Sequence, residues 1–347
     1  CGFCRAVCPL FGLTKRPAFN ARGKMLILKE VMDGRIDLDD QLVDTLFQCT
    51  TCGACAEQCP SGVNPPEIIK QVRKDMVHNH SCHPAFEGMY KVLSEHTNIY
   101  GEDDTEDFER ERNRKAAFVY FIGCVGSYRE DEATLAALDL LDHLKVDYTL
   151  IDEVCCSGVL DDVGFRTQTD LAGKNVDLIL QTGAKTVITG CPYCFRTFND
   201  RPAYKALADN GIEVVHISQF LRNFDMGVET EKKVTYHDPC DLGRHCGIYD
   251  APRETIQKIA PDFVEMRHHR ENALCCGAGG GVRGAYAKNS IAMARRRLEE
   301  VEEIGAEIVL TECNSCVHNL GNAKLRSQKF KVYTTTQFIN RLIQGEE

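Results

Sequence analysis

Residues 116–347 alternate short apolar runs with longer amphipathic stretches. The short runs suit buried strands, whereas the longer stretches show the 3.6-residue hydrophobic period of helices. The strand-like runs are 118–122, 186–189, 213–216, 234–237, 307–311 and 331–334, and the helical stretches lie near 130–144, 168–182, 250–260, 284–304 and 336–344. Alternating strands and helices predict a parallel sheet with helices on both faces, which is an α/β, Rossmann-like arrangement.

The first 80 residues are predicted to be helical instead. Residues 22–35 have the pattern of one amphipathic helix that ends at Gly34, and a second helix is expected from Pro65 to about His78. Residues 81–115 are predicted to be a linker. Its second half, 101–115, carries seven acidic and four basic residues with Phe108 as the only bulky apolar one, so a solvated connector is favoured over a binding segment.

The α/β region contains an internal repeat. Residues 183–194 align with 305–316, with Gly, Ala, Val, Thr and both Cys at matching positions, and 213–221 match 331–339. This self-similarity indicates two lobes related by a pseudo-twofold axis. We therefore predict an α+β multidomain chain, with a helical domain at 1–80, a linker at 81–115, and pseudo-symmetric α/β lobes at 116–228 and 229–347.

Composition adds one anomaly, which is cysteine. The chain has 347 residues, 19 of them Cys, and a formal net charge of −10. A chain of this length does not need disulfides for stability, so the cysteines indicate metal binding. The negative charge argues against a duplex nucleic-acid partner, and the longest strongly apolar stretch, 116–125, is too short to span a bilayer.

Two cysteine groups in the helical domain have iron–sulfur spacing. The second group is a complete C-x2-C-x2-C-x3-C-P run, the pattern of bacterial ferredoxins, in which the fourth Cys ligates the other cluster. We therefore predict one cubane [4Fe–4S] cluster on Cys8, Cys49, Cys52 and Cys55, and another on Cys1, Cys4, Cys59 and a Cys three residues upstream of the chain. We expect the natural N-terminus to lie upstream as well, because the chain begins with Cys1 and not Met. Zinc knuckles are the disfavoured alternative.

Each predicted lobe carries the same set of five cysteines. The first set is Cys124, Cys155, Cys156, Cys191 and Cys194, and the second is Cys240, Cys275, Cys276, Cys313 and Cys316. Each cysteine lies at the carboxyl end of a predicted strand or in the following loop, the edge where open α/β sheets build their sites. Five thiolates exceed the four that a cubane needs, so the spacing suggests an unusual cluster with a bridging thiolate. Structural zinc in one lobe is the alternative.

Other signals are weaker. The run Gly277-Ala-Gly-Gly-Gly281 lacks nucleotide-loop spacing, so close backbone approach to a cluster is favoured, with Gly277, Gly279 and Gly280 as the cofactor-binding positions. Residues 295–297 are three Arg in a predicted helix among four Glu, which predicts a solvated face. Cys82 and Cys246 fit no set and are predicted to be ordinary thiols.

These motifs resemble the heterodisulfide reductase family and its twin CCG domains. The resemblance rests on both five-Cys sets, on Cys275-Cys-Gly-Ala-Gly-Gly-Gly281 and on His237-Asp-Pro-Cys240. A two-cluster ferredoxin domain followed by two CCG lobes is similar to the fused HdrD-type (HdrC/HdrB-like) catalytic subunit. The same architecture occurs in glycolate and lactate oxidase iron–sulfur subunits and in DsrK-type proteins. The first lobe departs slightly, with Cys155-Cys-Ser-Gly158 where many members have Cys-Cys-Gly.

The resemblance implies one noncubane [4Fe–4S] cluster on each five-Cys set, with a disulfide cleaved between the two. The cofactors expected are thus two cubane and two noncubane clusters. His237 and His245 flank Cys240 and are candidate proton donors. The heterodisulfide is anionic, so five arginines that follow the cluster motifs are candidates for its cleft: Arg129, Arg166, Arg196, Arg244 and Arg283.

Two functions follow from the resemblance. The first is the disulfide-cleaving subunit of a heterodisulfide reductase, an oxidoreductase of methanogenesis acting on CoM-S-S-CoB. The second is an electron-transfer subunit of a flavin 2-hydroxyacid dehydrogenase or of a DsrK-like membrane complex. Either would need a donor subunit, a flavin HdrA-like or heme b membrane protein, in a hetero-oligomeric complex. The expected location is the cytoplasm, or the cytoplasmic membrane surface through a partner, without a direct membrane span.

Overall fold

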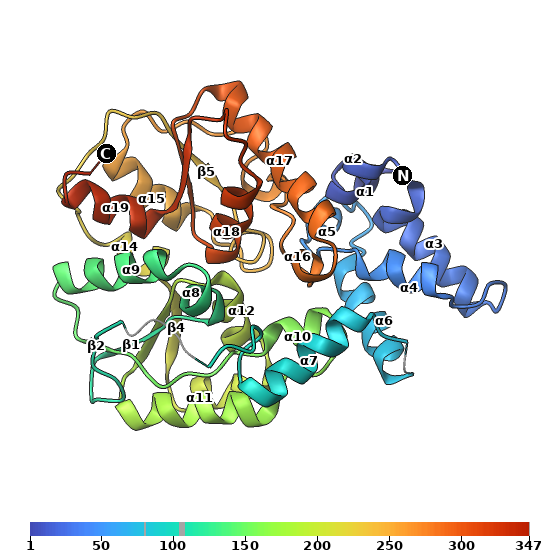
Figure 1. The fold of residues 1–347 in the computed structure, drawn as a ribbon, viewed down its shortest axis with the longest axis horizontal. Coiled ribbons are helices and arrows are strands. Elements are labelled where there is room, and N and C mark those ends of the chain that lie inside the picture. The colour runs from blue at the N-terminus through green and yellow to red at the C-terminus, as the bar shows by residue number, and fades with distance from the viewer. Residues whose placement is uncertain (80, 104–107, 347) are drawn as a thin grey trace.

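The computed structural model describes residues 1–79, 81–103 and 108–346, and its N-terminal domain is helical and lies at one end of the molecule (Figure 1). Its helices are α1 (Phe3–Ala6), α2 (Pro9–Thr14), α3 (Ala21–Met32), α4 (Asp40–Phe47), α5 (Ala54–Glu57) and α6 (Pro65–His78), with a 3-10 turn at Pro17–Phe19. Side chains fix where two of them begin, because Asn20 accepts from the Gly23 N–H at α3 and Asp39 from the Leu42 N–H at α4. The two helices that the sequence predicts are α3 and α6.

The segment 81–115 is more ordered than the solvated connector that its charge predicts. It contains α7 (Pro84–His96), and Phe108 is buried. Arg110 pairs with Asp139 at 2.7 Å and with Asp142 at 2.8 Å, so part of the charge run is attached to the first lobe. Residues 104–107 of the same run lie outside the described residues.

The first lobe is an α/β layer structure around a four-stranded parallel sheet in the order β2-β1-β3-β4. The strands are β1 (Phe118–Phe121), β2 (Tyr148–Thr149), β3 (Thr186–Thr189) and β4 (Glu213–His216). The helices are α8 (Cys124–Tyr128), α9 (Asp131–His143), α10 (Gly158–Asp162), α11 (Thr169–Thr182), α12 (Pro192–Asp200), α13 (Lys205–Asp209) and α14 (Ile217–Leu221), with a 3-10 turn at Pro202–Tyr204.

The second lobe repeats this plan with a three-stranded parallel sheet in the order β5-β6-β7. The strands are β5 (Val234–His237), β6 (Ile308–Thr311) and β7 (Lys331–Thr334). The helices are α15 (Asp250–Ile259), α16 (Val282–Ala285), α17 (Ala287–Ile304), α18 (Asn314–Ala323) and α19 (Thr335–Ile343), with a 3-10 turn at Arg270–Asn272. No helix in the described ranges is long and apolar enough to cross a membrane.

The two lobes pack through a shared apolar core between α9 and α19, which lie side by side in Figure 1. Leu138 and Leu140 of α9 meet Phe338 and Ile339 of α19 there, and all four are nearly inaccessible to solvent. The repeat is also visible in local structure, because α14 and α19 both begin with a capping box that uses a Gln at the third helical position. The α/β repeat predicted from the sequence is therefore present.

Candidate metal centres

In the helical domain, four of the predicted ligands line one cavity. Cys8, Cys49, Cys52 and Cys55 surround about 420 Å³ of empty volume, together with the side chain of Lys24. This is the set predicted from the ferredoxin crossover. Burial lowers the pKa of Lys24 to about 8, against the opposing effect of the nearby Cys49 and Cys8 thiols.

The other predicted cubane set lies toward the surface. Cys1 is exposed, and Cys4 and Cys59 are half-buried. Helix α1, which carries Cys4, contacts α5, the helix between Cys55 and Cys59. The set therefore occupies the more exposed part of this domain.

In the first lobe, the topology brings the five cysteines to the carboxyl edge of the sheet. Cys124 follows β1 and begins α8, while Cys191 and Cys194 lie at the start of α12, which follows β3. The Cys155 and Cys124 Sγ atoms are 3.9 Å apart, and those of Cys194 and Cys156 are 3.5 Å apart. Cys156, Cys191 and Cys194 pack in one apolar cluster, and Cys155 packs in another with Leu93 of α7.

In the second lobe, the matching cysteines have matching positions. Cys240 follows β5, and Cys313 and Cys316 lie at the start of α18, which follows β6. The Cys316 and Cys276 Sγ atoms are 3.3 Å apart. Cys275 differs from its first-lobe counterpart because it reaches the helical domain, where it packs with Cys52 and lies 3.6 Å from the Thr50 hydroxyl.

The donor chemistry of both lobes fits an iron–sulfur cluster. All of these thiols are free, and four in each lobe are buried. Hydrogen bonds from Cys155 and Cys194 lower the pKa of Cys156, and those from Cys275 and Cys316 lower the pKa of Cys276. Each Cys-Cys pair thus holds its second sulfur ready as a thiolate, the soft ligand that iron–sulfur clusters take.

The serine that replaces glycine in the first lobe does not change the loop. Ser157 adopts a left-handed backbone with φ 55°, close to the φ 89° of its counterpart Gly277. The Ser157 N–H lies 3.4 Å from the Cys155 sulfur, and the Gly277 N–H lies 3.3 Å from the Cys275 sulfur. The Ser157 hydroxyl also accepts from the Gln168 N–H, which supports the strained conformation.

The glycine run of the second lobe contacts protein backbone. A Cβ on Gly279 would lie 2.7 Å from the Thr50 carbonyl oxygen, and one on Gly280 would lie 2.5 Å from that of Cys49. A Cβ on Gly277 would lie 2.5 Å from the Ser290 carbonyl oxygen. Glycine is needed here because the loop packs directly on the helical domain and on α17. A cofactor-binding role for these three positions stays a prediction.

The two histidine candidates lie in different places. A ring nitrogen of His237 and the sulfurs of Cys276 and Cys316 all lie within 4.8 Å of one another. Burial and the positive charge of Arg297 lower the pKa of His237 to about 3, so its ring is uncharged at neutral pH. His245 instead lies at the domain junction, with its Nε2 2.9 Å from the Thr51 carbonyl oxygen, and burial lowers its pKa too.

Four of the five arginine candidates already have protein partners. Arg129 pairs with Glu102, Arg196 pairs with Asp241, Arg244 donates to the Cys52 carbonyl, and Arg283 donates to the Tyr100 hydroxyl. Arg166 is exposed on the surface. The structure therefore uses most of these side chains to hold the cluster loops together.

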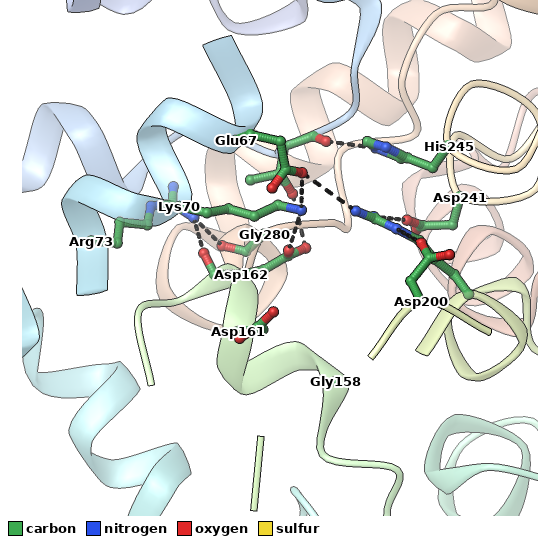
Figure 2. Close-up of polar contacts among 12 residues, drawn as sticks. Glu67, Lys70, Arg73, Gly158, Asp161, Asp162, Asp200, Asp241, His245 and Gly280 are labelled. Atoms are coloured by element: carbon green, nitrogen blue, oxygen red, sulfur yellow. Dashed lines mark hydrogen bonds and ion pairs between the residues drawn. The ribbon is translucent and has the colours of Figure 1, made fainter. Parts of the chain in front are cut away.

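Helix α6 anchors the junction of all three domains, as Figure 2 shows for Lys70 and Arg73 facing Asp162 of α10. Arg73 is completely buried and donates to the carbonyls of Cys49, Asp162 and Gly280, and also to those of Leu46 and Phe47. These carbonyls lie beside the cysteine loops of the helical domain, the first lobe and the second lobe. Lys70 pairs with Asp162 at 3.2 Å.

The prediction for Arg297 was wrong, and the role of Arg73 was not predicted at all. Arg297 was expected on a solvated face of its helix, but it is 1% exposed and pairs with Glu300. The usable signal was helical periodicity, because Arg297 lies on the same face of α17 as Met293 and Val301. For Arg73 the sequence offers no such signal, since its partners are backbone carbonyls from distant segments.

Comparison with known proteins agrees with this architecture. The cysteine-rich domain family, CCG, matches residues 118–199 and 234–321, and the 4Fe-4S dicluster domain family matches residues 1–63. A hypothetical protein from Helicobacter pylori shares the fold, with a TM-score of 0.65 at 12% identity over 96% of this chain and 69% of its own.

Curated relatives identify the family. The chain is 30% identical to the HdrD-type subunit of the dihydromethanophenazine:CoB–CoM heterodisulfide reductase of Methanosarcina barkeri, over 93% of this chain and 88% of the relative. It is 31% identical to the protein of the same name from Methanosarcina acetivorans, over 92% and 87%. It is also 30% identical to a subunit of the fumarate reductase (CoM/CoB) of Methanothermobacter marburgensis, over 78% and 56%. The chain therefore belongs to the HdrD-type family of heterodisulfide reductase subunits and is an iron–sulfur oxidoreductase subunit.

Proposed function

We propose that this chain is the catalytic subunit of a heterodisulfide reductase-like complex, which reductively cleaves the disulfide between coenzyme M and coenzyme B. The observation that carries the proposal is the pair of complete five-thiol sets, each gathered around a Cys-Cys pair in one of two packed lobes. The relatives named as heterodisulfide reductase subunits support the choice of substrate.

The proposed cluster sites follow from the thiols that lie together. Cys8, Cys49, Cys52 and Cys55 would hold one cubane cluster, and Cys1, Cys4 and Cys59 would supply ligands to another. Each five-Cys set would hold a noncubane cluster, with the thiolates of Cys156 and Cys276 available to bridge irons. When bound, the clusters supply the two electrons, one at a time, that opening a disulfide requires.

The chain's own residues would order the sites. Cys275 and Thr50 join the helical domain to the second lobe, so we infer that this lobe is the one coupled to the ferredoxin domain. Arg73 and Asp162 hold the first lobe at the same junction. We further propose that the exposed set at Cys1 and Cys4 faces a donor subunit, flavin-containing or heme b-containing, in the cytoplasm or at the inner membrane surface.

The test is turnover of the heterodisulfide by the intact complex, combined with electron paramagnetic resonance (EPR) of the oxidised protein with and without coenzyme M. We expect turnover and a coenzyme M-dependent signal, both lost in a Cys276→Ser variant. Cys82→Ser is the matched control, because Cys82 packs in the core of the helical domain, outside every thiol set, and its loss should leave both readouts intact. A complex without turnover and without the signal would overturn the proposal in favour of an electron-transfer subunit for a 2-hydroxyacid dehydrogenase or a DsrK-like complex.

A further inference from the structure

The two lobes differ at one position beside their thiols. His237 ends β5 three residues before Cys240, and the repeat places Phe121 at the end of β1, three residues before Cys124. Both side chains are buried. Phe121 packs edge-on against Phe198 with ring centroids 4.7 Å apart, in the apolar cluster that contains Cys156 and Cys194. The second lobe therefore has a polar nitrogen where the first has hydrocarbon.

The hydrogen bond from Arg297 fixes the tautomer of His237. The Arg297 Nε–H donates to His237 Nδ1 at 3.0 Å. A guanidinium group has donors but no acceptor, so Nδ1 must be the unprotonated nitrogen. The remaining hydrogen of the neutral ring is then on Nε2, the nitrogen that Arg297 leaves free.

Arg297 is itself held firmly in place. It is 1% exposed, donates to the His268 carbonyl at 2.7 Å, and pairs with the carboxylate of Glu300. The first lobe lacks these groups. The aligned residues of α11 are Asn175 and Leu178, and Asn175 bonds instead to the backbone of Val154 at 2.9 Å.

We propose that His237, oriented by Arg297, is a fixed hydrogen-bond donor to the sulfurs at Cys276 and Cys316 and makes the second lobe's cluster easier to reduce than the first lobe's. Hydrogen bonds to the sulfurs of an iron–sulfur cluster raise its reduction potential, and a partner that orients the histidine keeps the donor in place. Phe121 offers the first lobe no donor. The inference rests on the proposed clusters, and it adds an order of reduction between two sites that the repeat makes look equivalent.

The experiment is a redox titration of the reconstituted full-length chain followed by EPR, with iron content measured on each sample. His237→Phe copies the first lobe, and we expect a tenfold smaller equilibrium constant for reducing the second lobe's cluster, which corresponds to about 59 mV for one electron. Iron content and the first lobe's potential should stay unchanged. Phe121→Leu is the control and should leave the second lobe's potential where it was.

Arg297 provides an independent arm that also covers a His237→Phe protein that fails to fold. Arg297→Met should lower the same potential, because either nitrogen of His237 can then carry the hydrogen. Arg297→Lys, which can still donate to Nδ1, should restore most of it. Equal potentials in these two variants would overturn the proposal, as would an unchanged potential in a folded His237→Phe protein.

Two further outcomes separate this inference from the proposed function. Loss of iron from the second lobe of His237→Phe would make His237 a ligand and overturn its role as a donor. Normal heterodisulfide turnover with no shift in potential would overturn only this inference. A wild-type second lobe that binds no cluster would overturn both.

Discussion

The two lobes have the same sulfur geometry in different surroundings. Ser157 and Gly277 take the same left-handed turn, and each lobe directs thiols at the second sulfur of its Cys-Cys pair. The first lobe surrounds its thiols with apolar groups such as Phe121, whereas the second contacts the ferredoxin domain through Cys275 and sets His237 beside its sulfurs. The repeat thus preserves the ligands, and the neighbouring residues distinguish the two sites.

The comparison is tested most severely by removing one thiolate from each lobe. Cys156→Ser and Cys276→Ser should each lose about four iron atoms per chain, the content of one cluster. Turnover should fall in both variants by more than the roughly 10–100-fold typical of losing an outer-shell partner, because the proposed reaction uses both lobes. Iron analysis and activity assays check this. Full activity in Cys156→Ser would show that the first lobe is dispensable.

The junction should be sensitive to the loss of Arg73, which serves both lobes. Arg73→Met leaves several buried carbonyls without a donor, and we expect the free energy of unfolding to fall by about 3–5 kcal/mol. Chemical denaturation followed by circular dichroism measures it. The matched control is Lys74→Met, one residue along α6, where the Lys74–Asp161 pair is partly exposed and its loss should cost about 1 kcal/mol or less. Equal effects would contradict the anchoring role of Arg73.

Asp162 should give the same junction a dependence on pH. Burial alone would raise its pKa, but the charges of Lys70 and Arg196 outweigh burial and lower the pKa from 3.8 to about 2. Because the folded pKa is depressed, the carboxylate stabilises the fold above the unfolded pKa, and this stability is lost as the pH falls through the folded one. We expect Asp162→Asn to cost about 2 kcal/mol at pH 7 and roughly half of that near pH 3.

Unfolding of the wild type and Asp162→Asn across this pH range checks that expectation. A difference in unfolding free energy that stays constant between pH 7 and pH 3 would mean that the Asp162 charge is not the source of the stability.

The smallest effect is expected on the outer side of the first lobe. Arg129 pairs with Glu102 at 2.6 Å, but about a third of the Arg129 side chain is exposed. Arg129→Ala should therefore change the free energy of unfolding by less than about 1 kcal/mol. A larger loss of stability would show that this surface of the first lobe is as tightly integrated as the junction. A raised KM with unchanged stability would support the substrate role predicted for Arg129.

The sequence alone predicts the elements and the thiol sets, because strand and helix periods and cysteine spacing are local patterns. The repeat at 183–194 and 305–316 also reveals the two lobes before any coordinates are known. It does not reveal which lobe meets the ferredoxin loop, since Arg73 reaches Asp162 across 89 positions and Gly280 across 207. The burial of Arg297 is likewise hidden, because its ring partner His237 comes from another strand.

The central claim is that the ferredoxin domain is coupled to the second lobe through the contact of Cys52 and Thr50 with Cys275. The most direct measurement is EPR of the fully reduced protein, in which spins of neighbouring clusters broaden each other's signals. The claim predicts that broadening of the ferredoxin-domain signal disappears in Cys276→Ser and persists in Cys156→Ser. Broadening that persists in Cys276→Ser and disappears in Cys156→Ser would contradict it.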